Sequence, residues 1–164
     1  YQKMVERGII ELAAELGGRV MVLFTSYAQL RETSKAITPR LTLGNIAVYD
    51  QSFGTSRDSL LDSFKSTDKA VLMGTRSFWQ GIDIPGDDLS ALVIVRLPFA
   101  VPSDPIFASR SEAYNNRGIV AIFDSRIITK SYGNSFLESL PDCTTQYGSL
   151  ENLPKIASDW INKA

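Results

Sequence analysis

One loop of this sequence holds an unusual concentration of chemically capable side chains. It spans residues 74–86, GTRSFWQGIDIPG, and contains hydroxyls, an arginine, two aromatic rings and an aspartate among three glycines and a proline. The apolar runs at 71–73 and 91–95 flank it, as is typical of strands buried on both faces of a parallel sheet. A connection between two core strands does not need such residues. Because open α/β sheets bind ligands at the carboxyl ends of their strands, we expect this loop to bind a ligand.

A second candidate site lies where the apolar segment RVMVLFTS, residues 19–26, gives way to a helix. Ser26 and Gln29 form a capping box, S-x-x-Q, so the predicted strand delivers Thr25 and Ser26 to a helix N-terminus. The free amides and positive dipole end of a helix suit a phosphate group. Ser26 could also be an N-cap and nothing more, and the sequence alone leaves both interpretations open.

Alternating strands and helices must position these two sites. Apolar periodicity predicts a first helix that ends at Gly17 and Gly18 and a second that ends at Pro39, while Thr55 and Asp58 form a second capping box. The remaining expected elements are a strand at 45–51, a short helix at 104–112, a strand at 118–126, a helical segment at 127–141 with a break near Gly133, an edge strand at 144–149 and a last helix at 154–163 that buries Trp160. This alternation predicts one α/β domain, with a parallel sheet covered by helices on both faces.

Composition limits the chemistry that this domain can perform. The chain has 164 residues, of which 44% are hydrophobic, so it is long enough to bury a core. Its net charge of −1 means that any nucleic-acid contact must come from local groups. A single cysteine excludes a disulfide framework. The lack of histidine excludes acid–base chemistry by histidine and metal ligation by histidine. The sequence has no apolar run long enough to cross a membrane and no signal peptide. We therefore expect the protein to lie in the reducing interior of a cell, with no membrane partner.

Three stretches of the chain carry a resemblance to a known family. They are MVLFTSYAQL, then VLMGTRSFWQGIDIPGDDLSALVIVRLPFAVPSDP, then GIVAIFDSRIITKSYGNSFLESLP. Together they resemble the second motor domain of the DinG/XPD-like superfamily 2 DNA helicases. The resemblance implies a RecA-like three-layer αβα fold with a central, mostly parallel sheet. It also implies the C-terminal lobe of a motor that couples ATP binding and hydrolysis to translocation along single-stranded DNA and to unwinding. The expected partners are single-stranded DNA and the N-terminal RecA-like lobe, in the cytoplasm, or in the nucleus of a eukaryote.

The resemblance also implies two groups of site residues. Those expected to face DNA are Thr25, Ser26, Thr75, Arg76, Ser77 and Trp79. Those expected to face the nucleotide are Gly81, Ile82 and Asp83. Hydroxyls, backbone amides and one or two cations suffice to hold phosphates without reading base sequence. Phe78 and Trp79 could stack on bases or belong to the core, and Asp83 could simply bind loop amides.

Three segments of the family pattern are missing from this sequence. Neither the phosphate-binding loop G-x-x-x-x-G-K-T/S nor the acidic metal-holding box is present, so we expect no catalytic residue and no metal site in this chain. ATP and Mg²⁺ would be held mainly by the first lobe, and an iron–sulfur cluster would belong to the parent protein. The family's arginine-bearing helix, Q-x-x-G-R-x-x-R, is also missing. We expect the break to fall at residues 113–117, by deletion or by disorder in the parent.

Two other functional classes remain open from the residues alone. One is a non-catalytic α/β module that binds single strands or a partner protein. The other is a free-standing α/β enzyme that acts on a small phosphorylated ligand, although the lack of histidine leaves few candidates for acid–base chemistry.

Overall fold

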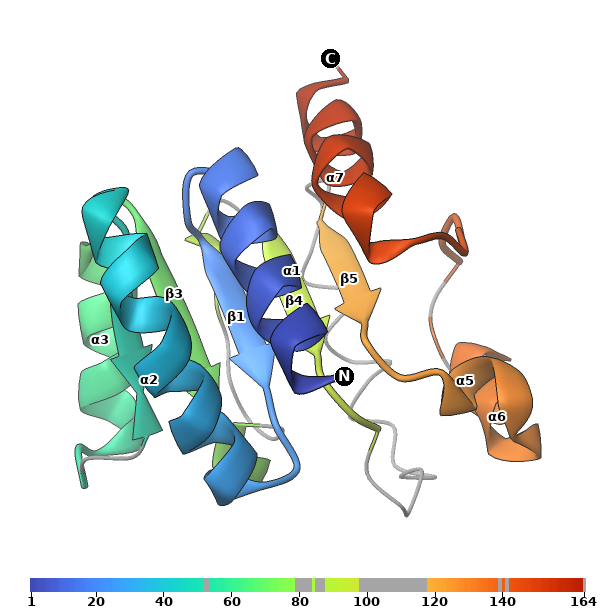
Figure 1. Ribbon diagram of the computed structural model, residues 1–164, viewed down its shortest axis with the longest axis horizontal. Coiled ribbons are helices and arrows are strands. Elements are labelled where there is room, and N and C mark those ends of the chain that lie inside the picture. Colours follow the sequence, from blue (N-terminus) through green and yellow to red (C-terminus); the bar gives the residue numbers. More distant parts are fainter. Residues whose placement is uncertain are drawn as a thin grey trace.

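The fold is built on a five-stranded sheet with the strand order β2-β3-β1-β4-β5 (Figure 1). The computed structural model describes residues 1–51, 54–78, 84, 88–97, 118–138, 140 and 142–163. The strands are β1 (Val20–Leu23), β2 (Ala47–Asp50), β3 (Ala70–Gly74), β4 (Ala91–Ile94) and β5 (Ile119–Ile122). All described strand pairs are parallel, so their carboxyl ends meet at one edge of the sheet.

Helices cover both faces of this sheet (Figure 1). One face packs against α1 (Gln2–Glu15), α2 (Tyr27–Leu43) and α7 (Leu153–Asn162). The other packs against α3 (Arg57–Ser66), α5 (Arg126–Thr129), α6 (Ser131–Glu138) and the short 3₁₀ turn η2 (Arg76–Phe78). A second 3₁₀ turn, η4 (Leu150–Asn152), precedes α7. The expected three-layer αβα architecture is therefore confirmed.

The central strands are apolar without interruption because both of their faces are buried. In β1, Val20 and Val22 join the core beneath α1 and α2, whereas Met21 and Leu23 join the core beneath α3. All four side chains are at most 2% exposed. Successive side chains of a strand point to opposite faces, so a strand between two helical layers needs apolar residues at every position.

The second helix continues through Pro39, where the sequence predicted its end. A proline inside a helix removes one backbone hydrogen bond and disturbs the preceding turn. Beside it, the Thr38 hydroxyl donates to the Ser34 carbonyl at 2.6 Å. Continuation buries Leu41, which is 2% exposed, on the same helix face as Ile37. Burial of an apolar face thus outweighs the local cost of the proline.

Two predicted boundaries shift by a few residues. The N-cap of α3 is Ser56, whose Oγ accepts from the Ser59 amide at 3.2 Å, so the helix begins one residue later than a cap at Thr55 implies. The break between α5 and α6 falls at Lys130 and not at Gly133, which lies inside α6. A Cβ at Gly133 would lie 1.9 Å from the carbonyl oxygen of Ile127, so this glycine allows the two helices to approach closely.

Two predictions for the C-terminal part were wrong. No strand forms at 144–149; the chain crosses instead to α1, where Leu150 packs so closely against Gly8 that a Cβ there would lie 2.8 Å from its Cδ1. Trp160 is 40% exposed, because α7 contacts the core mainly through Ala157. The expected helix at 104–112 and the expected break at 113–117 lie outside the described residues. Within the described part of the chain, no helix has the length and apolar character needed to cross a membrane.

Candidate nucleic-acid interface

The carboxyl ends of β1 and β3 lie side by side and bring both predicted sites together. Leu23 is paired with Gly74 at the end of the two strands, and the Phe24 amide donates to the Gly74 carbonyl at 2.9 Å. Thr25 follows β1 directly after Phe24, and Thr75 follows β3 directly after Gly74. The segments 25–26 and 75–77 therefore occupy the same edge of the sheet, as the sequence predicted for a ligand site.

Ser26 caps α2 as the capping pattern predicted. Its Oγ accepts from the Gln29 amide at 3.4 Å, a long hydrogen bond. Thr25, Ser26 and Tyr27 are all exposed, so the positive end of this 17-residue helix faces open space at the carboxyl edge. The role of Ser26 as an N-cap is confirmed, and it leaves the first amides of the helix accessible to an anion.

The loop after β3 begins with a tight turn built on a buried aromatic ring. The Phe78 amide donates to the Thr75 carbonyl at 2.8 Å, which closes η2, and the Phe78 side chain is fully buried. A Cβ at Gly74 would lie 2.5 Å from the Phe78 ring, so this position requires glycine. The interpretation of Phe78 as a core residue is confirmed. Anchored in this way, the turn leaves Ser77 exposed.

Gln51 ties this turn to the neighbouring strand. Its Oε1 lies 3.1 Å from the Thr75 amide nitrogen and 2.9 Å from Thr75 Oγ1. Its Nε2 lies 2.6 Å from Ser77 Oγ. Sequence reasoning missed Gln51. The available signal was its position as a polar residue directly after a predicted strand.

The residue before Gln51 is a buried acid that joins β2 to α2. Asp50, the last residue of β2, is 9% exposed and accepts a hydrogen bond from the Ser34 hydroxyl of α2. This bond joins α2 to the end of β2, and the next residue joins β2 to the turn after β3. Three elements of the carboxyl edge are thus held in register by side-chain hydrogen bonds.

The β4 and β5 end of the same edge contains a second polar cluster. The buried Asp124 carboxylate accepts from the Leu97 amide at 2.9 Å and from Arg126 Nη2 at 2.6 Å. Arg126 Nη2 also donates to the Leu97 carbonyl at 3.0 Å. Burial favours a higher pKa for Asp124, but hydrogen bonds from Arg126 and Leu97 outweigh it, so its pKa lies below the usual value. Hydrogen bonding to Asp124 raises the pKa of Arg126. The cluster holds together the chain segments that leave β4 and β5.

Arg96 belongs to an aromatic contact at this end of the edge. Its guanidinium carbon lies 4.8 Å from the centroid of the Tyr1 ring, in cation–π geometry. The Tyr1 hydroxyl contacts the Val95 carbonyl and, at 2.7 Å, the Phe123 carbonyl. Burial, as the largest effect, raises the pKa of Tyr1. The start of the chain thus packs across the ends of β4 and β5.

Several predicted site residues lie outside what the structure describes. Trp79 and the expected nucleotide-facing residues Gly81, Ile82 and Asp83 are outside the described residues. Arg76 is described only through its backbone in η2. Across the described ranges, no group of three His, Cys, Asp or Glu side chains is arranged to hold a metal ion.

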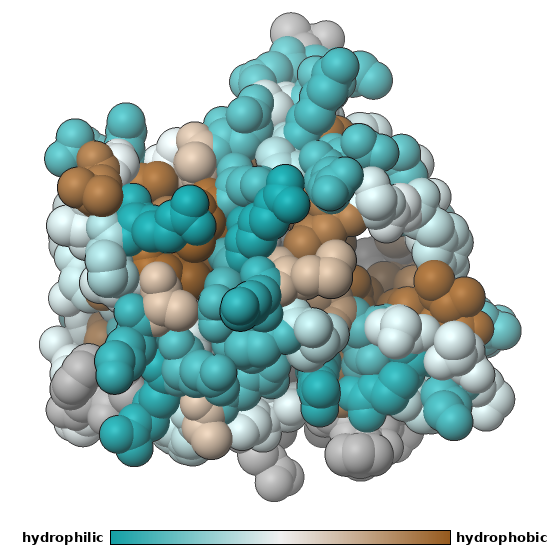
Figure 2. Space-filling model, viewed as in Figure 1, coloured by the Kyte–Doolittle hydropathy of each residue, from teal (hydrophilic) through white to brown (hydrophobic). Residues whose placement is uncertain are grey.

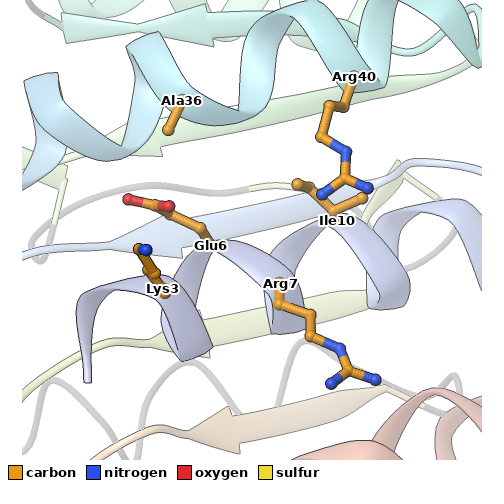
Figure 3. Close-up of a pocket in the computed structure, with 6 residues that line it drawn as sticks. All are labelled: Lys3, Glu6, Arg7, Ile10, Ala36 and Arg40. Atoms are coloured by element: carbon orange, nitrogen blue, oxygen red, sulfur yellow. The ribbon is translucent and has the colours of Figure 1, made fainter.

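Two further surface features lie away from this edge. A groove of about 330 Å³ between α1 and α2 is lined by Lys3, Glu6, Arg7, Ile10, Ala36 and Arg40 (Figure 3). Figure 2 shows hydrophobic residues on the surface at the β5 side of the molecule, near α5. Val120 of β5 is 51% exposed and Ile128 of α5 is 68% exposed.

Comparison with known families gives a clear match. The sequence profile of the helicase C-terminal domain matches residues 9–118. The chain is 31% identical over 155 residues to the ATP-dependent DNA helicase YoaA of Escherichia coli K12, covering 76% of this chain and 24% of that protein. It is 32% identical over 164 residues to the ATP-dependent helicase DinG of Mycobacterium tuberculosis H37Rv, covering 81% of this chain and 24% of that protein.

A third relative is the 3'-5' exonuclease DinG of Bacillus subtilis 168, which is 30% identical over 162 residues. That match covers 79% of this chain and 17% of the relative. The chain therefore spans less than a quarter of the length of each of these three proteins.

Two solved structures share the fold. Saccharomyces cerevisiae Dbp5 bound to RNA and ADP BeF3 superposes with a TM-score of 0.68 at 16% identity, covering 96% of this chain and 42% of that one. The Escherichia coli DEAD-box protein SrmB bound to regulator of ribonuclease activity A gives a TM-score of 0.57 at 14% identity, covering 90% of this chain and 93% of that one. These structures confirm the RecA-like architecture.

Proposed function

This chain belongs to the family of helicase C-terminal domains, and we propose that it is the lobe of a DinG-like, ATP-dependent DNA helicase that holds single-stranded DNA during each ATP cycle. In the proposed cycle, the lobe closes on ATP held by an N-terminal lobe and changes its contact with the DNA backbone. The translocation step and the partner lobe are inferred from the family, whose curated relatives are much longer than this chain.

The observation that carries this proposal is the convergence of 25–26 and 75–77 at one sheet edge. The pairing of Leu23 with Gly74 places an exposed helix N-terminus and the exposed residue Ser77 at the same edge of the sheet. Amides and hydroxyls of this kind bind phosphate oxygens without reading bases, which suits a protein that must move along any sequence. With a chain charge of −1, such local groups matter more than a general attraction to DNA.

We assign the nucleotide contacts of the lobe to the same loop. We place Gly81, Ile82 and Asp83 toward ATP, with Mg²⁺ and most phosphate contacts supplied by the N-terminal lobe, because this sequence has no phosphate-binding loop of its own. An iron–sulfur cluster, if the parent has one, lies outside this chain. The names of the relatives, which are ATP-dependent helicases, support the use of ATP by the parent protein.

The length of the alignments supports a missing segment. The match to the Bacillus subtilis relative extends over 162 positions but covers only 79% of this 164-residue chain. Part of the alignment therefore lies opposite gaps in this chain. We assign the gap to the arginine-bearing helix that the family carries ahead of Arg117. Without that helix and without a phosphate-binding loop, the chain alone does not hydrolyse ATP.

The proposed contact is tested by binding of a fluorescein-labelled oligothymidine of about 16 nucleotides, followed by fluorescence anisotropy at stated salt concentrations. We expect saturable binding that weakens as salt rises, and weaker binding by the Ser26→Ala and Ser77→Ala variants. Ser66→Ala is the matched control, because exposed Ser66 ends α3 at the opposite edge of the sheet. Absence of binding at low salt, or an equal loss in all three variants, would contradict the proposal.

The competing functional class, a non-catalytic binding module, predicts a different sequence for the parent protein. A helicase parent must carry G-x-x-x-x-G-K-T/S upstream of this chain, whereas a binding module need not. The exposed apolar residues Val120 and Ile128 favour a further protein surface packed beside β5, which either parent could supply. Sequencing the coding region upstream of Tyr1 separates the two classes.

A further inference from the structure

The donors and acceptors in the hydrogen bonds around Gln51 can be assigned in only one way. The Thr75 amide is a donor and can never accept, so the Gln51 atom that faces it at 3.1 Å must be the oxygen Oε1. This assignment leaves Nε2 opposite Ser77. Because an amide nitrogen only donates, Ser77 Oγ must accept at 2.6 Å. Thr75 Oγ1, 2.9 Å from Oε1, must in turn donate. One backbone amide therefore determines the orientation of all three side chains.

This arrangement gives the two hydroxyls opposite roles. Both donors of Thr75 are used by Gln51, and the Thr75 residue is 4% exposed. The Ser77 hydroxyl accepts from Gln51, so its own hydrogen stays available, and Ser77 is exposed at the carboxyl edge. Of the hydroxyls in this turn, only Ser77 can then donate to a ligand. A group that needs donated hydrogens, such as a phosphodiester oxygen, matches this arrangement.

We propose that Gln51 is a positioning residue that reserves the Ser77 hydroxyl hydrogen for a backbone phosphate of single-stranded DNA and withdraws Thr75 from the contact. This inference rests on the proposed function, because it assigns the chemistry of the same DNA-binding edge. It revises the expectation that Thr75 and Ser77 contact DNA alike. Gln51 follows β2, so the proposal also brings a third strand into the interface.

The decisive variant is Gln51→Glu, which keeps the shape of the side chain and reverses one hydrogen bond. A carboxylate only accepts, so one oxygen still satisfies Thr75 while the other takes the Ser77 hydrogen. We expect the affinity for the labelled oligothymidine to fall by about tenfold, as for loss of a hydrogen bond to a charged group. Gln146→Glu makes the same change of charge at an exposed residue outside the cluster and is the matched control.

A double-mutant cycle with Ser77→Ala separates this mechanism from repulsion by the new charge. If Gln51 acts through Ser77, Gln51→Glu adds less than about twofold in the Ser77→Ala background, and Gln146→Glu changes affinity by less than about twofold in either background. Thermal unfolding of each variant verifies that it is folded.

Three results would overturn the proposal. Gln51→Glu could weaken binding no more than Gln146→Glu does, or it could weaken Ser77→Ala as strongly as it weakens the wild type. If the wild type still binds, either result rejects the role of Gln51 but does not contradict the proposed DNA-binding edge. A wild-type chain that binds no single-stranded DNA rejects both this inference and the proposed function.

Discussion

Gln51 and Thr75 follow neighbouring strands, lie 24 residues apart in sequence and are joined twice through one oxygen atom. Gln51 Oε1 lies 3.1 Å from the Thr75 amide nitrogen and 2.9 Å from Thr75 Oγ1. The pairing of β2 with β3 makes this contact, since Asp50 lies opposite Met73 at the ends of the two strands. The interface is therefore a product of sheet register as much as of local sequence.

Removing the Gln51 amide should destabilise the fold as well as weaken DNA binding. In Gln51→Leu the amide and hydroxyl of buried Thr75 lose their acceptor, which typically costs about 1–3 kcal/mol. Urea unfolding followed by circular dichroism measures this change, with Gln146→Leu as the exposed control. A loss of less than about 0.5 kcal/mol, the range of ordinary surface substitutions, would mean that the Thr75 groups find other partners.

Gly74→Ala should disrupt the turn that presents Ser77. The added methyl group would lie 2.5 Å from the Phe78 ring, and overpacking of this kind costs about 1–3 kcal/mol. Gly148→Ala is the matched control because a Cβ there meets nothing within 4 Å. Urea unfolding of both variants checks the prediction. A Gly74→Ala protein as stable as Gly148→Ala would show that the Phe78 ring can move aside.

The Asp124 and Arg126 cluster should make stability depend on acid pH. Because its pKa in the folded state is lowered, the Asp124 carboxylate contributes stability above its unfolded pKa of about 3.9, and this contribution is lost as the pH falls through its folded pKa. Asp124→Asn should therefore lower the free energy of unfolding at pH 7 and flatten its pH dependence below about pH 4.

Urea unfolding between pH 7 and pH 3 measures that effect. Asp142→Asn serves as the control, since Asp142 is exposed. If Asp124→Asn and Asp142→Asn showed the same acid dependence as the wild type, the cluster would contribute no pH-linked stability.

The purified chain should not turn over ATP. It contains no phosphate-binding loop, so nothing in it cradles the β- and γ-phosphates or the accompanying Mg²⁺. We expect no phosphate release above background with ATP and Mg²⁺, either with or without oligothymidine. Turnover that co-purifies with the chain and is removed by Asp83→Ala, at a residue assigned to the nucleotide side, would contradict this expectation.

Sequence patterns predicted the parts of this protein that depend on local or periodic signals. The capping role of Ser26 follows from a short-range pattern and was confirmed, and of the two roles that the sequence left open for Phe78 the structure shows the core role. The end of α2 at Pro39 was predicted wrongly because burial of Leu41 decides the helix length. Gln51 was missed because its role exists only once β2 and β3 pair, and no local pattern encodes that contact.

Binding of DNA at the carboxyl edge of the sheet is tested most directly by a nuclear magnetic resonance titration of the ¹⁵N-labelled 18.1 kDa chain with oligothymidine. We expect the amide signals of Ser26 and Ser77 to shift together, while that of Ser66 at the opposite edge stays unchanged. Shifts centred on Lys3 and Arg40 in the groove between α1 and α2, with no change at Ser26 and Ser77, would contradict the placement of DNA at the carboxyl edge.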